Sequence, residues 1–524
     1  MIQDNKILVG KGENPVFLLP QMANRHGLIA GATGTGKTTT LKVLAEGFSA
    51  MGVPVFLADI KGDLMSLCQS GAPSDRINER LAQMGITDFT YSTFPLMCWD
   101  VFGQGGHPVR ATISEMGPLL LSRLLNLNDT QQSVLSMIFK IADEQNLLLL
   151  DMKDFKSILQ YVADHAQDFA TEYGFVTKQS IGAIQRNMTA LEQQGADSFF
   201  GEPALDINDW LRLDSTAKGY VNVLDATKLY QSPGLYATML LYLLSELFEK
   251  LPEVGDPEKP KMVFFFDEAH LLFDDAPKAL TDKIVQVVRL VRSKGVGVYF
   301  ITQSPMDVPG DVLAQLSNRI QHALRAYTPA DQKVIKATSD TFRPNPAFKV
   351  QDVITQLATG EALISFLDEK GVPGITERAL ILPPQSFMGT VDAAAKQQCM
   401  AASPVSGKYD TAVDRESAYE MLVKKHADEE AAAVAAAAQA EAAKQAAIDA
   451  KAAEKQAAAE AKQAQKQQEQ AEKAAQKDHE RNVRMVENMA GSVLKGVGRE
   501  VARNINNPML RSILGSLVGG TRRY

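Results

Sequence analysis

A glycine-rich segment near the N-terminus has the residue types that bind nucleotide phosphates. Residues 31–38 read Gly-Ala-Thr-Gly-Thr-Gly-Lys-Thr and match the pattern GxxxxGK[ST]. Glycines let the backbone curl so that its N–H groups point to phosphate oxygens, and the N-terminus of the next helix adds partial positive charge. Lys37 would contact the β- and γ-phosphates, and the Thr38 hydroxyl would bind Mg²⁺. We therefore expect ATP and Mg²⁺ as cofactors, bound by Gly31, Ala32, Thr33, Gly34, Thr35, Gly36, Lys37, Thr38 and Thr39.

Two adjacent carboxylates follow a run of five apolar residues. Met262–Phe266 predicts a buried strand, and Asp267 and Glu268 stand at its carboxyl end. We expect Asp267 to hold Mg²⁺ and Glu268 to polarise the attacking water as general base. The letters Asp-Glu-Ala-His also occur in helicases with two cores. Only about 115 residues separate Glu268 from the Pro383-Pro384 break, so the sequence predicts a single ATPase core.

A glutamine and two arginines complete the candidate catalytic set. Gln303 follows Val296–Ile301, a predicted strand between the other two, where its amide can contact both phosphate and water. A single core benefits from an arginine finger, which a neighbouring subunit commonly supplies. Arg292, near the end of a predicted helix over 281–294, is our candidate, with Arg289 as the alternative. The alternative is that both arginines only stabilise their helix, because positive charge is favourable at a helix C-terminus.

Strand and helix patterns alternate around these residues, which predicts a doubly wound, mainly parallel α/β sheet. We expect two parts of the ATPase core at 1–104 and 216–385, separated by a mostly helical insertion at 105–215. Residues 386–426 are expected to form a linker. The predicted strands are Arg25–Ala30, Val53–Ala58, Tyr220–Leu224, Met262–Phe266, Val296–Ile301, Arg319–Leu324, Ala362–Phe366 and Arg378–Ile381.

The C-terminal part has a different composition. Residues 427–480 are mostly Ala, Gln, Glu and Lys, which predicts one long helix. It lacks a Leu/Ile heptad seam, so we expect a solvated spacer, with a weak alanine-seam coiled coil as the alternative. Residues 481–524 carry 8 basic and 2 acidic residues and contain an amphipathic basic helix. This tail could dock on the body, pair with its copies, or bind a membrane or nucleic acid.

The remaining composition narrows the class of protein. The net charge of −8 argues against a wholly basic nucleic-acid coat. The three cysteines, Cys68, Cys98 and Cys399, are scattered and predict neither a disulfide framework nor a metal site. The N-terminus does not resemble a signal peptide, and apolar stretches are too short for a membrane span. We therefore expect a cytoplasmic protein.

Two sets of segments resemble known proteins. The first set is Gly31–Thr38, Asp267-Glu268, Arg289–Gly297 and Ile301–Gln303. It resembles the HerA/FtsK-like branch of P-loop ATPases. The second set is Arg25–Lys37, Asp59–Leu64 and Leu127–Gln131. It resembles more closely the bacterial YjgR-type HerA-like ATPases. The resemblance implies a RecA-like fold of the additional-strand (ASCE) class, a ring of six subunits, arginines acting in trans, and a role in hydrolysis for Arg25.

The predicted function is a ring-forming ATPase that translocates or remodels nucleic acid. HerA proteins carry an N-terminal β-barrel that docks a nuclease, but only about 24 residues precede the P-loop strand here, so nuclease pairing is not expected. The acidic body leaves two alternatives open. One is an ATPase acting on a protein or membrane-associated partner through the tail, and the other is a slow nucleotide-dependent scaffold.

Overall fold

Strand pairing across the chain builds a single mixed sheet. The computed structural model describes residues 1–174, 177–274 and 278–486. Within them, 13 strands form one sheet in the order β1-β2-β13-β12-β11-β4-β10-β9-β5-β8-β6-β7, and β3 pairs with β2. The strands are β1 (Ile2–Gln3), β2 (Lys6–Lys11), β3 (Pro15–Leu18), β4 (Gly27–Ala30), β5 (Val55–Asp59), β6 (Leu96–Asp100), β7 (His107–Pro108), β8 (Val221–Asp225), β9 (Met262–Phe266), β10 (Val296–Thr302), β11 (Asn318–Gln321), β12 (Glu361–Ser365) and β13 (Glu377–Ile381).

The sheet has a parallel part and an antiparallel edge. The strands from β11 to β7 in this order run parallel, whereas β12, β13, β2, β1 and β3 pair antiparallel. The predicted α/β fold with a RecA-like, mainly parallel sheet is confirmed, and each strand predicted from the sequence is present within a few residues. Five strands were not predicted from the sequence, because they are short or lie toward the two sheet edges: β1, β2, β3, β6 and β7.

Helices cover both faces of the sheet, because its central strands are apolar on both sides. On β9, Val263 and Phe265 join the core under α1 (Lys37–Ala50). Phe264 and Phe266 point to the other face, where α8 (Pro233–Lys250) and α9 (Lys278–Val291) pack. This alternation follows from the two-residue period of a strand. Both faces of β9 are therefore buried, which fixes the strand end that carries Asp267 and Glu268.

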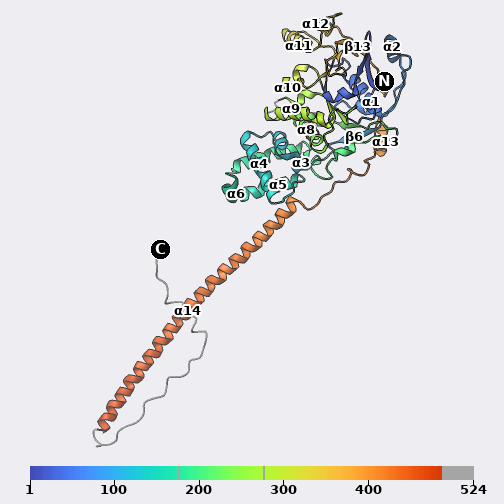
Figure 1. Cartoon of the computed structure of the whole chain (residues 1–524). Helices are drawn as coiled ribbons and strands as arrows, with labels where there is room; N and C mark the ends of the chain where they lie inside the picture. The colour runs from blue at the N-terminus through green and yellow to red at the C-terminus, as the bar shows by residue number, and fades with distance from the viewer. Residues whose placement is uncertain (175–176, 275–277, 487–524) are drawn as a thin grey trace. The chain divides into compact units, whose positions relative to one another are not determined.

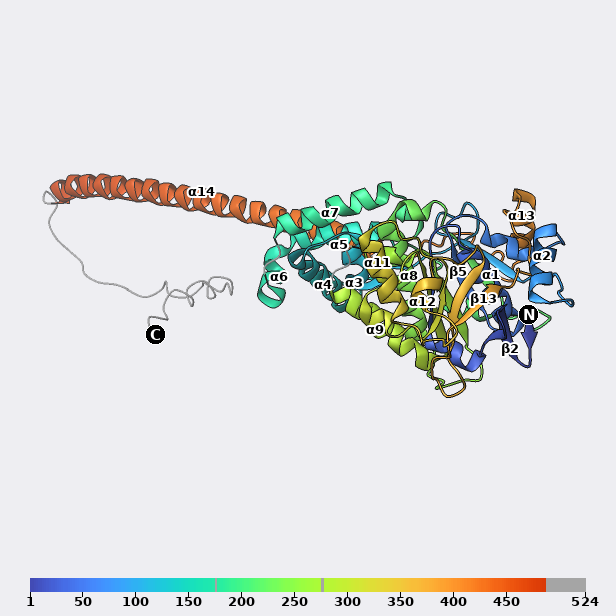
Figure 2. The ribbon, with the colours of Figure 1, turned by 90° about the horizontal axis from the view of Figure 1, so that it is seen from above.

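In the described part of the chain, five helices follow one another between residues 113 and 193, within the segment 105–215 that we expect to be a helical insertion. They are α3 (Ile113–Leu124), α4 (Asp129–Glu144), α5 (Met152–Asp164), α6 (Ala166–Tyr173) and α7 (Lys178–Gln193). They gather on one side of the sheet in both views (Figures 1 and 2). Capping boxes begin α3, α4 and α5, since Thr112, Asn128 and Asp151 each accept an N–H bond from the third residue of their helix. Apolar residues of these helices join the core on the α8 face.

Residues 386–426 are not a linker, contrary to our expectation. The compact unit runs from Met1 to Asp428, and the segment contains α13 (Ala393–Ala401) and the beginning of α14 (Ala418–Val486). Tyr409 is fully buried, and its hydroxyl donates to Asp209 Oδ2 at 2.5 Å. Ala418 and Leu422 join the same core. These apolar residues are spaced too irregularly to give a helical or strand period, so the sequence did not reveal the packing.

Two further contacts fasten the segment before α14. Arg415 Nε donates to Glu202 Oε2 at 2.6 Å. Ser417 Oγ donates at 2.6 Å to Asp154 Oδ1, a buried carboxylate on α5. We call residues 403–417 the C-terminal strap. It attaches the chain to the insertion and to the loop after it.

The second unit begins at Glu429 and its described part is helical. The predicted helix over 427–480 lies within α14, and its described side chains are exposed, including Val434 at 65% and Ile448 at 60%. Nothing in this unit tests a coiled coil. Most of the predicted basic tail, from residue 487 on, lies outside the described residues. No helix in the described part of the chain is long and apolar enough to cross a membrane.

Candidate nucleotide site

The carboxyl ends of neighbouring parallel strands bring the predicted residues to one edge of the sheet. The glycine-rich loop follows β4, and Asp267 follows β9. Between these strands lies β10, which ends directly before Gln303. The sequence-based placement of the Gln303 strand is therefore correct. Ligands of open α/β sheets bind at this edge.

The glycine-rich loop adopts a curled backbone that requires its glycines. Gly31, Gly34 and Gly36 have φ angles of 154°, 78° and 113°. A Cβ at Gly31 would lie 2.5 Å from the Cβ of His322, which is too close. Lys37 is the first residue of α1, and its ammonium donates to the carbonyl oxygens of Gly31 and Ala32. The loop thus curls around the Lys37 amine. It lies at the N-terminus of a helix, which is where proteins commonly bind phosphate.

Asp267, the first of the two carboxylates at the end of β9, is buried. Burial, followed by the neighbouring Glu268 charge, raises the pKa of Asp267 to about 6. A bound cation would offset this cost, which fits the predicted role of Asp267 as a metal ligand beside Thr38. Asp267 Oδ1 accepts the backbone N–H of Glu268 at 2.9 Å, so the carboxylate is oriented by its own strand end.

Glu268 has a backbone conformation that residues other than glycine rarely adopt. Its φ and ψ are 47° and 51°, in the left-handed region. Its Oε2 is buried without a hydrogen-bond partner among the described residues, although His270 Nδ1 lies 3.4 Å away. Strain of this kind gathers at functional sites. A carboxylate oxygen that is oriented but free of hydrogen bonds can accept one from water, as a general base must.

Lys37 and the carboxylates act on one another electrostatically. Burial lowers the pKa of Lys37, and the negative charges of Glu268 and Asp267 oppose this shift. The described site therefore brings together Lys37, Asp267 and Glu268, as the sequence predicts. Thr38 and Thr39 follow Lys37 in the first turn of α1 and are half-buried.

Gln303 is exposed at the tip of β10, on a turn that Asp307 holds. One oxygen of Asp307 accepts from Thr302 Oγ1 at 2.6 Å and from the N–H of Ser304 at 2.9 Å. Asp307 was not predicted as a site residue. Its spacing from Ser304 is that of a capping box, a signal that could have revealed it.

His322 supports the loop from behind and was also missed. Its Nδ1 lies 3.0 Å from the carbonyl oxygen of Glu361, which can only accept, so this nitrogen carries the proton. Nε2 then accepts from the hydroxyl of Thr40 on α1 at 2.8 Å. Burial, and to a lesser extent the charge of Lys37, lowers the pKa of His322 to about 4. The ring is therefore neutral near pH 7.

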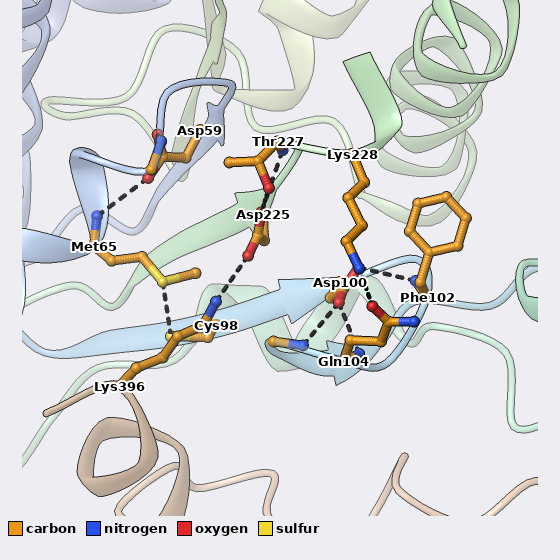
Figure 3. A network of polar contacts seen from close by, with 12 residues as sticks. Asp59, Met65, Cys98, Asp100, Phe102, Gln104, Asp225, Thr227, Lys228 and Lys396 are labelled. Atoms are coloured by element: carbon orange, nitrogen blue, oxygen red, sulfur yellow. Dashed lines mark hydrogen bonds and ion pairs between the residues drawn. The ribbon is translucent and has the colours of Figure 1, made fainter. Parts of the chain in front are cut away.

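The loop after β5 brings a second lysine, Lys61, to this edge. Asp59 accepts four backbone N–H bonds, from Gly62, Asp63, Leu64 and Met65, at 2.7 to 3.3 Å. The last of these contacts is drawn in Figure 3. This clamp fixes the turn that carries Lys61, whose charge acts on both Asp267 and Lys37. The sequence analysis noted this segment only through its resemblance to a family.

Arg25 and Arg292 lie at the opposite edge of the sheet. Arg25 precedes β4 and Arg292 precedes β10, so both stand at the amino ends of strands whose carboxyl ends form the site. Both guanidinium groups approach Asp256, at 3.6 Å and 3.4 Å. The structure therefore does not bring either arginine to the P-loop of its own chain. Arg289 is exposed on α9.

Comparison with known proteins places this chain in a family. A family model described as "Helicase HerA-like C-terminal" matches residues 4–523. The chain belongs to the helicase HerA-like C-terminal family. This confirms the prediction of a HerA-like P-loop ATPase, whereas the closer likeness to the YjgR type stays a prediction.

Individual HerA proteins are distant relatives of this family member. The DNA double-strand break repair helicase HerA of Sulfolobus acidocaldarius is 23% identical over 347 residues, which are 65% of this chain and 62% of that protein. The protein of the same name from Saccharolobus solfataricus is 24% identical over 372 residues, 69% of this chain and 66% of the relative. The chain thus spans less than two thirds of the length of each relative.

Solved structures give likenesses at lower identity. The plasmid coupling protein TrwB in complex with the ATP analogue ADPNP is 15% identical, with a TM-score of 0.48, covering 74% of this chain and 94% of that one. VirB4 of Thermoanaerobacter pseudethanolicus is also 15% identical, with a TM-score of 0.46, covering 73% of this chain and 97% of that one.

Proposed function

We propose that this HerA-like protein is a cytoplasmic, ring-forming, Mg²⁺-dependent ATP hydrolase that translocates or remodels nucleic acid. The observation that carries the proposal is the convergence of Lys37, Asp267 and Glu268 at one sheet edge. In this proposal Lys37 and the loop amides hold the phosphates, and Thr38 and Asp267 hold Mg²⁺, which supplies charge neutralisation when bound. Glu268 takes the proton of the attacking water.

The position of the arginines supports assembly into a ring. Arg25 and Arg292 precede strands whose far ends carry the site, so a neighbouring subunit is the natural recipient of their charge. A head-to-tail contact between the two edges would place the arginines of one chain at the nucleotide of the next, and such contacts can close into rings. Gln303, exposed at the tip of β10, would then contact the γ-phosphate in its own chain.

Nucleic acid is the proposed polymer because the relatives are described as DNA repair helicases. The chain has a net charge of −8, so phosphate contacts would come from Lys and Arg collected around the axis of the ring.

The test is ATP turnover of the purified full chain with and without double-stranded and single-stranded DNA. Stimulation by DNA, falling with added salt, is the expected result. Fast basal turnover indifferent to DNA would favour a protein or membrane partner, and a rate near zero throughout would favour the scaffold. Exposed Lys140→Ala is the matched control for Lys37→Ala, which should abolish turnover with either DNA.

A further inference from the structure

The fold gathers the cysteines that appear scattered in the sequence. Cys98 in β6 is buried in the core on the α1 face. Cys68, the last residue of the short helix η2 (Leu64–Cys68), and Cys399 on α13 pack against the same core and are half-buried. All three cysteines of the chain therefore lie in or against one apolar cluster.

Backbone pairing holds the end of η2, which carries Cys68, beside the segment that leads to Cys399. The N–H of Gly71 donates to the carbonyl of Gln385 at 3.0 Å, and that of Phe387 donates to Gln69 at 2.9 Å. Glu46 of α1 fixes the same segment, since one of its oxygens accepts the N–H of Gln385 at 2.7 Å. The chain after β13 thus runs beside the end of η2 before it enters α13.

A salt bridge sets the orientation of α13. Lys396 Nζ lies 2.7 Å from Oδ2 of Asp225, at the end of β8, and α13 packs on the neighbouring strand β6. Figure 3 shows Lys396 reaching Asp225 close to Cys98, whose thiol lies 3.9 Å from Met65 Sδ. Cys399 follows Lys396 by three residues and so lies on the same helix face. That face is directed at the cysteine cluster.

The three thiols differ in reactivity. Cys68 and Cys399 share a hydrogen bond, which lowers the pKa of Cys399 and raises that of Cys68. Burial raises the pKa of Cys98 to about 12, so this thiol stays protonated and shielded. Because the thiolate is the nucleophile, we expect Cys399 to react first and Cys68 to be its thiol partner.

We propose that Cys68 and Cys399 form an oxidisable dithiol site that closes to a disulfide on reaction with hydrogen peroxide. The Cys399 thiolate attacks one peroxide oxygen, the O–O bond breaks, and the departing hydroxide takes a proton to become water. Cys68 then attacks the sulfur of the resulting sulfenic acid. The S–S bond forms as the S–O bond breaks, and the second hydroxide takes the Cys68 proton and leaves as water. The two sulfurs are oxidised and the peroxide is reduced.

The bond would link η2 to α13 across a loop of more than three hundred residues. The η2 helix directly follows the turn clamped by Asp59, and α13 leads into the C-terminal strap. A disulfide in native geometry restricts the unfolded chain most when the closed loop is long. The site goes beyond the proposed function and can be tested without ATP.

Peptide mapping of the full-length protein tests the site directly. The reduced protein is treated with hydrogen peroxide, free thiols are blocked with iodoacetamide, and the digest is examined by mass spectrometry. We expect a linked Cys68–Cys399 peptide pair that dithiothreitol separates. Before oxidation, Cys399 should be alkylated about tenfold or more faster than Cys98. Cys98→Ala is the matched control and should still form the link, whereas Cys68→Ser and Cys399→Ser should not.

Two results of the peptide mapping would overturn the site. One is a wild-type protein in which Cys68 and Cys399 remain fully alkylatable after peroxide. The other is a dominant link that contains Cys98. Melting of the oxidised wild type gives an independent measure, with an apparent Tm raised by on the order of a few degrees and restored by reduction. A lower Tm after linkage would show that the native arrangement must be distorted to form the bond, and would also overturn the proposal.

Discussion

The carboxylates and the histidine around the P-loop show how single residues are prepared for their roles. Asp267 is held by its strand end, Glu268 by a left-handed backbone, and His322 by one donor and one acceptor contact. Lys37, Asp267 and Glu268 were predictable, because sequence motifs place them next to apolar strands. His322 was not, because its contacts depend on β11 lying beside β4, a pairing between segments almost 300 residues apart.

Replacement of the candidate general base should separate binding from hydrolysis. We expect Glu268→Gln to bind ATP as the wild type does, because Lys37 and the loop remain. Turnover should fall by roughly 10²- to 10⁴-fold, since the amide cannot take the proton of the water. Nucleotide titration and phosphate release measure the two effects.

Glu249→Gln at the exposed end of α8 is the matched control, and its turnover should be unchanged. Retention of most activity by Glu268→Gln would show that another group acts as the base.

Buried His322 makes stability sensitive to acid. Its pKa is lowered to about 4 in the folded protein, below the 6.5 of an unperturbed histidine. The unfolded chain therefore binds more protons between these values, so stability is full above pH 6.5 and is lost as the pH falls toward 4. From pH 7 to pH 5 this group should remove about 2 kcal/mol from the free energy of unfolding.

His322→Asn keeps a donor for the Glu361 carbonyl and does not titrate. Denaturant unfolding at several pH values should show a shallower acid dependence in this variant. Buried His26, with its pKa lowered to about 3, stays in both proteins and supplies the remaining slope. An unchanged slope would mean that His322 titrates near its ordinary pKa in the folded protein.

At the scale of elements, short-range patterns and long-range pairing were predictable to different degrees. Central strands such as β9 are continuous apolar runs and were located from the sequence. The C-terminal strap was not, because it is stabilised by partners far away in the chain. Strand β2, which joins its hairpin with β3 to distant β13, was not located either. Tyr409 illustrates the problem, since nothing near it in the sequence marks its contact with Asp209.

The strap predicts where the chain can be shortened. A protein ending after Asp428 should keep its Tm and bind nucleotide, because the compact unit ends there. A protein ending after Lys408 loses Tyr409, Ala418 and Leu422 from the core. Removing a buried aromatic side chain alone typically costs about 3–5 kcal/mol, so this shorter protein should melt far lower or fail to fold.

Thermal melting and nucleotide binding of both proteins measure the effect. Val434→Ala in the full chain is a control for a side chain outside the compact unit and should leave Tm unchanged. Equal stability of the two shortened proteins would contradict the assignment of the strap to the core.

At the scale of the whole molecule, the arginines and the site belong to opposite edges. If Arg292 acts in trans, mixing Arg292→Ala with Lys37→Ala should restore ATP turnover that each variant lacks alone. Some contacts in the mixture would pair an intact Lys37 pocket with an intact Arg292. An arginine finger raises the rate of hydrolysis about 10³-fold or more, so a few restored subunit contacts are enough to give measurable turnover.

Native mass spectrometry must confirm that subunits mix. Lys37→Ala with Glu268→Gln is the negative control, since both lesions disable the chain's own pocket and no mixed contact is complete. Mixed assemblies without recovered turnover would remove Arg292 from the trans role and leave Arg289 and Arg25 to be tested in the same way.

The C-terminal strap also determines how the protein would bear mechanical load. A pull on α14 would be met first by Leu422 and Ala418 in the core. It would then load the Ser417–Asp154 and Arg415–Glu202 contacts, and last Tyr409 in its buried site. These attachments lie on the insertion and the loop after it, not on the strands that carry the site. Tension would therefore break the strap one contact at a time before it reached the nucleotide-binding edge.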